Sequence, residues 1–196
     1  MEQTIPHKID LIGAAYLAPD IDIAGIQLAL HFTKGHVEVG IAGTNEDSDW
    51  FTNFYVRHYN GYHRGFYKMA EDVCKLIELA MPGGGYISLR GHSLGAAVAL
   101  IAHDLIVIRN PPNGKLYYAE DVLAIGVPKF ERQTIKRERC EIYTFKDDPI
   151  DLVPPRWMGW DMPDAKSIGK NRSGYRLKEH ALEAYSDYFI KQEVAK

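Results

Sequence analysis

The sequence is poor in cysteine and in net charge, and both shortages narrow the classes of protein to consider. Cys74 and Cys140 are the two cysteines among 196 residues, too few and too far apart for a disulfide scaffold or a CxxC-type zinc site. We interpret them as free thiols in a reducing compartment, with a single bridge between them as the alternative. The formal net charge of -3 gives no general attraction to nucleic acid, so no nucleic-acid partner is expected.

Long hydrophobic runs are also absent. The N-terminal apolar run LIGAAYLAP is bracketed by Asp10 and Asp20 and has no basic segment before it, which argues against a secretion signal. No apolar run in the sequence reaches the length of a membrane span, so we expect a cytoplasmic protein without stable membrane insertion. Repeats, low-complexity segments and long Pro/Gly/Ser linkers are lacking as well, and residues 1–196 are predicted to form a single domain.

What the sequence does contain is an alternation of two apolar periodicities. Short apolar runs bounded by Gly, Pro or Asp predict buried strands, and they lie at 36–44, 86–91, 121–128 and 140–145. Apolar residues at helical spacing predict helices over 66–81, from Leu94 to Ile108, and over a shorter stretch that contains Leu182, Tyr185 and Phe189. Strands separated by helices favour βαβ crossovers, so the expected fold class is α/β with a mainly parallel central sheet flanked by helices.

A serine flanked by glycines stands where one predicted strand gives way to a helix. The motif is Gly91-His92-Ser93-Leu94-Gly95, and GxSxG between a strand and a helix is typical of a nucleophile elbow. Such a turn exposes the serine hydroxyl, and the backbone N–H of Leu94 is available to a developing oxyanion. The alternative is a glycine-flanked turn in which Ser93 merely caps the helix. We interpret His92 as a packing or hydrogen-bonding residue.

A serine nucleophile needs a general base, and in this architecture the base follows the serine in the chain. Two histidines, His103 and His180, follow Ser93. His103 lies ten residues further along the same helix, which at about 1.5 Å per residue is too far to reach back to the hydroxyl. His180 is therefore the predicted base.

The acid that orients the base is expected just after the carboxyl end of a strand, where sites collect in such sheets. The segment CEIYTFKDDPIDLVPP offers three candidates, Asp147, Asp148 and Asp151, and the residues alone do not choose among them. No group of histidines has the spacing of a metal site, and serine chemistry needs no metal. We therefore predict no metal and no cofactor.

Several ordered motifs resemble those of the class 3 lipases, the fungal-type lipases of the α/β-hydrolase superfamily. The resemblance extends from about residue 37 to residue 190 and is carried by VEVGIAGTNEDSDWFTNF, HRGFYKMAEDV, GHSLGAAVALIAHDL, AIGVPKF, DDPIDLVPP and EHALEAYSDYF. It implies a compact α/β-hydrolase fold and a serine carboxylester hydrolase, a lipase or esterase that acts on lipid or acyl esters. The sequence departs from the family at Ile41-Ala42, where the family often has Phe-Arg.

The resemblance also implies roles for individual residues. By its spacing to Pro154-Pro155, Asp148 corresponds to the family's catalytic acid, with Asp151 as the second choice. Thr44 corresponds to the residue that supplies a backbone N–H and a hydroxyl to the oxyanion hole, beside the N–H of Leu94.

In the resembled lipases, the segment corresponding to 45–62 forms a lid whose apolar face meets lipid. Here it carries Trp50, Phe51 and Phe54, which we interpret as candidate lid or substrate-binding residues in transient contact with a lipid surface. The alternative is that they pack into the core. The chain is short for the family, so the lid is expected to be reduced. The basic run 166–178 is either a contact for anionic headgroups or solvated surface.

Two alternatives to an ester hydrolase remain open. The same machinery serves thioesterases, amidases and acyltransferases, because a triad does not specify the leaving group. A non-catalytic binding module with a hydrolase fold is the other, although intact Ser93, Asp148 and His180 argue against it.

Overall fold

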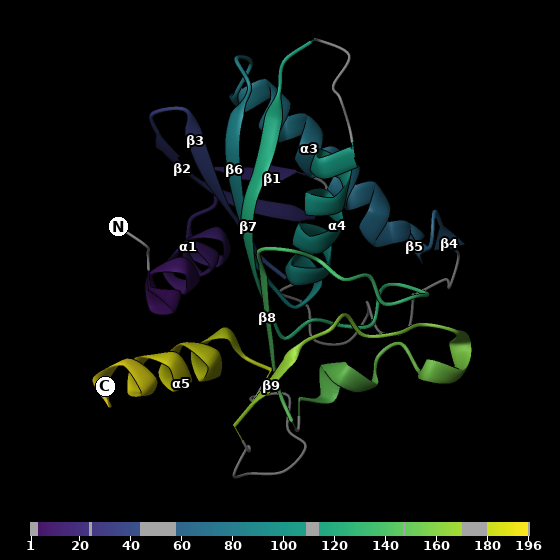
Figure 1. Cartoon of the computed structure of the whole chain (residues 1–196). Helices are drawn as coiled ribbons and strands as arrows, with labels where there is room; N and C mark the ends of the chain where they lie inside the picture. The colour runs from purple at the N-terminus through teal and green to yellow at the C-terminus, as the bar shows by residue number, and fades with distance from the viewer. Residues whose placement is uncertain are drawn as a thin grey trace.

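The computed structural model describes residues 4–23, 25–43, 58–108, 114–146, 148–169 and 180–195. Within them, seven strands form one sheet in the order β1-β2-β3-β6-β7-β8-β9 (Figure 1). These strands are β1 (Ile21–Ile23), β2 (Ile26–Thr33), β3 (His36–Ile41), β6 (Gly85–His92), β7 (Tyr117–Ile125), β8 (Cys140–Phe145) and β9 (Lys166–Ile168). A separate hairpin pairs β4 (His58–Tyr59) with β5 (Tyr62–His63).

In the seven-stranded sheet, β3, β6, β7, β8 and β9 run parallel to one another. The strands β2 and β1 extend that sheet in antiparallel pairs. The four predicted strands correspond to β3, β6, β7 and β8, and the expected α/β class with a mainly parallel sheet is confirmed. The prediction missed β1, β2 and β9. Two of these have only three residues each, and β2 is exposed over its last three residues, so none shows a clear buried-strand pattern.

Helices cover both faces of the sheet. The described helices are α1 (Ile5–Leu17), α3 (Arg64–Ala80), α4 (Leu94–Ile108) and α5 (Leu182–Val194). One face carries α3 and α4, packed against each other, and the opposite face carries α1 and α5 (Figure 1). Along β7, Val122 and Ala124 join the core with α4, whereas Leu123 and Ile125 join the cluster with α1 and α5. The three predicted helices correspond to α3, α4 and α5, and α1 was not anticipated.

Part of the sheet face that carries α1 is charged rather than apolar. Arg90 Nη2 lies 3.1 Å from Glu38 Oε1 and 3.0 Å from Asp121 Oδ1. Lys8 Nζ, on α1, lies 3.0 Å from Asp121 Oδ2 and 3.3 Å from Glu141 Oε2. These side chains line a hollow of about 750 Å³. Ion pairs therefore attach the beginning of α1 to the sheet.

In the described chain Cys74 and Cys140 are not bridged to each other, so the alternative of a single disulfide is not observed. Cys74 is buried on α3, and Cys140 is partly exposed at the start of β8. No helix in the described ranges combines the length and the apolar character needed to cross a bilayer.

Candidate active site

The turn between β6 and α4 has the backbone of a nucleophile elbow. Ser93 lies between the last residue of β6 and the first residue of α4 with φ 57°, a left-handed conformation that is costly for a residue with a side chain. A helix-capping serine is usually in the extended region instead. The Ser93 N–H donates to the carbonyl of Ile125 on β7 at 3.0 Å, which ties the strained residue to the neighbouring strand.

The two glycines of the motif allow α4 to begin against the sheet. A Cβ on Gly91 would lie 2.4 Å from the carbonyl oxygen of Gly95, and a Cβ on Gly95 would lie 2.3 Å from the carbonyl oxygen of Ile41. Both distances are far below any real contact between a Cβ and backbone. Hence the spacing of the glycines around Ser93 follows from the close packing of backbone on backbone.

Three side chains from different parts of the chain meet at this turn. Ser93 Oγ lies 2.6 Å from His180 Nε2, and His180 Nδ1 lies 2.9 Å from Asp148 Oδ2. Asp148 is buried beyond the end of β8, and Ser93 is 5% exposed. The structure therefore brings together Ser93, His180 and Asp148, the aspartate that the family resemblance favoured among three candidates.

Two further donors hold the Asp148 carboxylate. The Ile150 N–H donates to Oδ1 at 2.9 Å, and the Tyr185 hydroxyl donates to Oδ2 at 2.6 Å. Tyr185 is fully buried on α5, and burial together with the charge of Asp148 raises the pKa of its phenol well above the usual range. The sequence showed Tyr185 as part of a motif, five residues after His180, but did not indicate this contact.

The other two candidate acids differ in position from Asp148. Asp151 Oδ1 accepts a hydrogen bond from the Thr144 hydroxyl at 2.8 Å. Burial is the main cause that raises the pKa of Asp151 to about 6, and the charge of Asp148 adds to it. Asp147 lies outside the described residues. Of the two described candidates, Asp148 is the one hydrogen-bonded to His180.

A glycine after β7 makes room for the histidine. Gly126 has φ 59°, and a Cβ there would lie 2.9 Å from His180 Cε1. Any larger residue would meet the imidazole ring as well as adopt a left-handed backbone. The prediction assigned no role to Gly126, and its only signal was the glycine within the AIGVPKF motif.

His92, the residue before the serine, packs on the same histidine. The two rings stack with centroids 4.8 Å apart, and His92 Nε2 lies 2.7 Å from the backbone carbonyl oxygen of His180. Burial, with a smaller contribution from His180, lowers the pKa of His92 to about 3. His92 is thus a neutral hydrogen-bonding residue, in line with the sequence-based interpretation.

Part of the predicted oxyanion hole falls within the described chain. Leu94 is the first residue of α4, and the N–H groups of a helix's first turn have no intrahelical acceptor. Thr44 lies outside the described residues, but Gly43 before it adjoins the elbow, since a Cβ on Gly43 would lie 2.9 Å from Ser93 Cβ.

The predicted lid residues Trp50, Phe51 and Phe54 also lie outside the described residues. Residues 58–62 of the proposed lid segment belong to the β4–β5 hairpin. In the basic run, Lys166 begins β9 with its ammonium 5.5 Å from the Tyr143 ring centroid, and 170–178 lie outside the described ranges.

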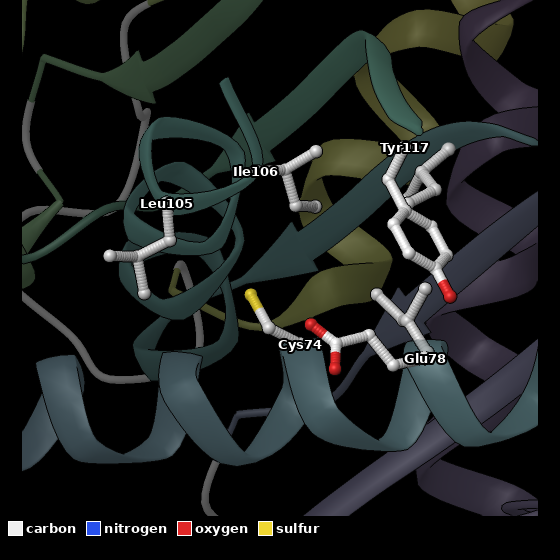
Figure 2. Close-up of a pocket in the computed structure, with 7 residues that line it drawn as sticks. Cys74, Glu78, Leu105, Ile106 and Tyr117 are labelled. Carbon is white, nitrogen blue, oxygen red and sulfur yellow. The ribbon is translucent and has the colours of Figure 1, made fainter. Parts of the chain in front are cut away.

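Two hollows elsewhere in the described chain do not include the serine. Figure 2 shows a small apolar crevice between α3 and α4, where Cys74 and Glu78 of α3 face Leu105 and Ile106 of α4, with Tyr117 at one side. Its volume of about 20 Å³ is the size of one water molecule. The other hollow is the charged one beside Lys8. Within the described ranges, no three His, Cys, Asp or Glu side chains form a group that would hold a metal ion.

The chain is similar to known proteins in sequence pattern and in fold. A family model described as Lipase (class 3) matches residues 38–145. No curated protein matches the chain. Among solved structures, MDLA from Penicillium cyclopium is 21% identical, with a TM-score of 0.57 over 79% of this chain and 63% of that one. A triacylglycerol lipase from Penicillium expansum is 15% identical, with a TM-score of 0.54 over 82% of this chain and 78% of that one.

A third structure is a propeptide complex of a Rhizomucor miehei lipase deletion mutant. It is 16% identical, with a TM-score of 0.52 over 78% of this chain and 54% of that one. The chain thus spans between about half and two thirds of the length of two of these three proteins. At such identities the likeness shows a shared fold, a mainly parallel sheet flanked by helices.

Proposed function

We propose that the chain, which belongs to the class 3 lipase family, is a serine carboxylester hydrolase. Ser93 is the nucleophile, His180 the general base and Asp148 the residue that orients the base. The observation that carries the proposal is the continuous pair of hydrogen bonds from Ser93 Oγ through the His180 ring to Asp148. The left-handed backbone of Ser93 supports it, because strain at one residue is typical of a functional turn.

The placement of protons follows from the partners of His180. The Asp148 carboxylate already receives donors at both oxygens, so the contact to His180 Nδ1 is a hydrogen bond donated by the ring. In the neutral ring, Nε2 then lacks a proton and accepts from the Ser93 hydroxyl. This is the tautomer that a general base needs.

Catalysis then proceeds through an acyl-enzyme. His180 Nε2 takes the Ser93 proton as Oγ attacks the ester carbonyl carbon. The N–H of Leu94 and the N–H and hydroxyl of Thr44 stabilise the oxyanion. The protonated His180 gives its proton to the leaving alcohol, and a water activated in the same way releases the acid. Loss of one oxyanion donor typically costs on the order of 10²–10³ in kcat. We therefore expect Thr44→Ala, which removes the hydroxyl and keeps the N–H, to weaken kcat far more than KM.

The substrate class is proposed at the level of lipid or acyl esters. Membership of the class 3 lipase family and the likeness to the Penicillium expansum protein, a triacylglycerol lipase, favour an ester over other acyl compounds. Thioester, amide and acyl-transfer chemistry use the same groups. Initial rates on matched ester, thioester and anilide substrates would rank them, and the proposal expects the ester to be fastest.

The decisive experiment is an assay on p-nitrophenyl esters of increasing acyl length, with Ser93→Ala as the matched control. We expect hydrolysis by the wild-type protein and none above background by Ser93→Ala. Equal inactivity of both on every chain length would refute the enzyme and leave a non-catalytic binding module. Activity that persists in Ser93→Ala would refute the nucleophile.

A second measurement addresses the lid and a transient contact with lipid. If residues 45–62 close over the site and open on lipid, the rate should rise sharply when a soluble ester is replaced by an emulsified one. A rate that follows the concentration of dissolved ester, with no rise at the emulsion boundary, would contradict the lid and leave Trp50, Phe51 and Phe54 as packing residues.

A further inference from the structure

Two side chains outside the triad connect the segments that meet at Ser93. Tyr16 lies near the end of α1, and its hydroxyl is 2.8 Å from His92 Nδ1 and 2.7 Å from the backbone nitrogen of Gly43. His92 Nε2, on the other edge of its ring, is 2.7 Å from the carbonyl oxygen of His180. One hydroxyl and one imidazole therefore link α1, the end of β3, the elbow and the segment that carries the base.

The direction of each hydrogen bond can be assigned. A carbonyl oxygen only accepts, so His92 Nε2 carries the proton that points to His180. Because the ring is buried and neutral, Nδ1 has no proton and accepts from the Tyr16 hydroxyl. The Gly43 N–H then donates to the Tyr16 oxygen. The side-chain protons of Tyr16 and His92 therefore each have one position in this set of hydrogen bonds.

The contacts at His180 show what this linkage adds. Its ring is held at Nδ1 by Asp148 and at Nε2 by Ser93, and its backbone is held at the carbonyl by His92. During the reaction the hydrogen bond to Ser93 is broken and remade, so among the described residues Asp148 is the permanent hydrogen-bond partner of the ring. The His92 contact is the second permanent attachment of the base, and it originates from the residue next to the nucleophile.

We propose that Tyr16 and His92 are positioning residues that align the base His180 and the oxyanion strand end at Gly43 with Ser93. The proposal rests on the serine-hydrolase function above. Gly43 precedes the expected oxyanion residue Thr44, so a shift at Gly43 moves an oxyanion donor, while a shift at the His180 carbonyl moves the base. Misplacement of about 1 Å at such a site can cost on the order of 10² in rate.

The first test is Tyr16→Phe, which removes one hydroxyl and keeps the ring that packs against His92 at a centroid distance of 5.9 Å. We expect kcat to fall by about 10- to 100-fold, with KM within about twofold of wild type, because ground-state binding is not altered. Tyr118→Phe is the matched control, since Tyr118 is 49% exposed on β7 and stacks on Tyr86, away from the elbow. That control should leave both constants unchanged.

A pair of substitutions at His92 separates positioning from packing. In His92→Gln the amide nitrogen occupies the position of Nε2 and can still donate to the His180 carbonyl. In His92→Asn the polar group occupies the position of Nδ1 and can reach only Tyr16. We expect His92→Gln to retain about tenfold more kcat than His92→Asn, the equivalent of one hydrogen bond, at similar melting temperatures.

Two readouts keep this proposal distinct from the proposed function. Ester turnover is measured beside the rate at which a fluorophosphonate labels Ser93, since labelling needs the activated serine but no ester specificity. Labelling without ester turnover would overturn the ester-hydrolase proposal alone, and Tyr16→Phe should still slow labelling. Wild-type labelling and turnover in folded Tyr16→Phe, or equal kcat in the two His92 variants, would overturn the positioning role. If folded wild-type protein shows neither ester turnover nor fluorophosphonate labelling of Ser93, both proposals are overturned.

Discussion

The two ends of α1 are attached to the same sheet face by opposite kinds of chemistry. At the beginning of the helix, Lys8 is ion-paired with Asp121 and Glu141 beside the charged hollow. Near its end, Tyr16 is held by neutral hydrogen bonds to His92 and Gly43. The ionic attachment lies away from Ser93, and the neutral attachment lies beside it. The comparison teaches that the attachment of α1 beside Ser93 is built from groups whose charge does not change.

The pKa values of the two attachments support this contrast. Burial opposes ionisation of Asp121, but the hydrogen bond and charge of Arg90, with Ser88 and Lys8, outweigh it and lower its pKa to about 2. Its folded pKa is depressed, so the stability it contributes is present above about pH 4 and is lost as pH falls toward 2. At the other end, burial raises the pKa of Tyr16 to about 12 and lowers that of His92 to about 3. Neither changes charge between those limits.

The largest effect is expected from Asp148→Asn, which removes the charge that holds the His180 ring next to the neutral attachment. An amide favours the wrong tautomer of His180, so kcat should fall by roughly 10³–10⁴ in ester hydrolysis assays. Asp151→Asn is the matched control because its side chain bonds to Thr144 and not to the His180 ring. Loss of activity in the control with full activity in Asp148→Asn would reverse the choice of acid.

Gly126→Ala tests how closely the base is packed. The new Cβ would meet His180 Cε1 and force alanine into a left-handed backbone, so we expect kcat to fall by about 10²-fold and the free energy of unfolding by about 1–3 kcal/mol.

Gly114→Ala provides the control for the backbone strain of that substitution. Gly114 also has a positive φ, 71°, but nothing lies within 4 Å of the position of its Cβ. It should lose stability in urea titrations without losing kcat. Equal losses of kcat in the two variants would show that general destabilisation, and not displacement of His180, reduces activity.

Lys8→Met tests the ionic end and should leave the neutral end intact. Methionine keeps the apolar stem and removes the charge that faces Asp121 and Glu141, both partly exposed. We expect the free energy of unfolding to fall by about 1–2 kcal/mol, between the values typical of exposed and buried pairs. The loss should shrink in high salt. Urea denaturation at two salt concentrations measures it, and a reduced kcat would contradict the separation of the two ends.

The smallest effect is expected from Asp151→Asn on stability. The folded pKa of Asp151 is raised to about 6, chiefly by burial, so the protonated form is favoured and stability is lost as pH rises from about 4 through 6. Asparagine stays neutral and still accepts from Thr144. The melting temperature of the variant relative to wild type should therefore increase across that window and level off above it. A difference that is constant from pH 4 to pH 7 would exclude titration of Asp151 as the cause.

Part of the site could be predicted from the sequence because the residues that indicate it are adjacent in the chain. The elbow around Ser93 is a five-residue motif between two periodic segments, and His180 follows by elimination. The choice of Asp148 over its neighbours required the family resemblance, since three carboxylates within five positions look alike to periodicity. Here the structure separates Asp148, bonded to His180, from Asp151, bonded to Thr144.

The remainder depends on contacts between distant segments. Tyr16 reaches His92 because α1 packs against β3. The amphipathic pattern of α1 is weak, so the sequence did not predict this helix. Gly126 is needed because His180, far along the chain, lies against it. Such roles follow from tertiary packing, which no local pattern encodes.

The alternation of side chains along β6 has a consequence for folding as well as for catalysis. Arg90 and His92 project to the α1 face, while Ile87 and Leu89 lie in the core with α4. A slip of β6 by one residue against its neighbours would turn Arg90 toward that apolar core, away from Glu38 and Asp121. The ion pairs of Arg90 with Glu38 and Asp121 therefore favour the observed register of β6 over a register shifted by one residue. The same register that satisfies Arg90 delivers His92 to Tyr16 and Ser93 to the end of the strand.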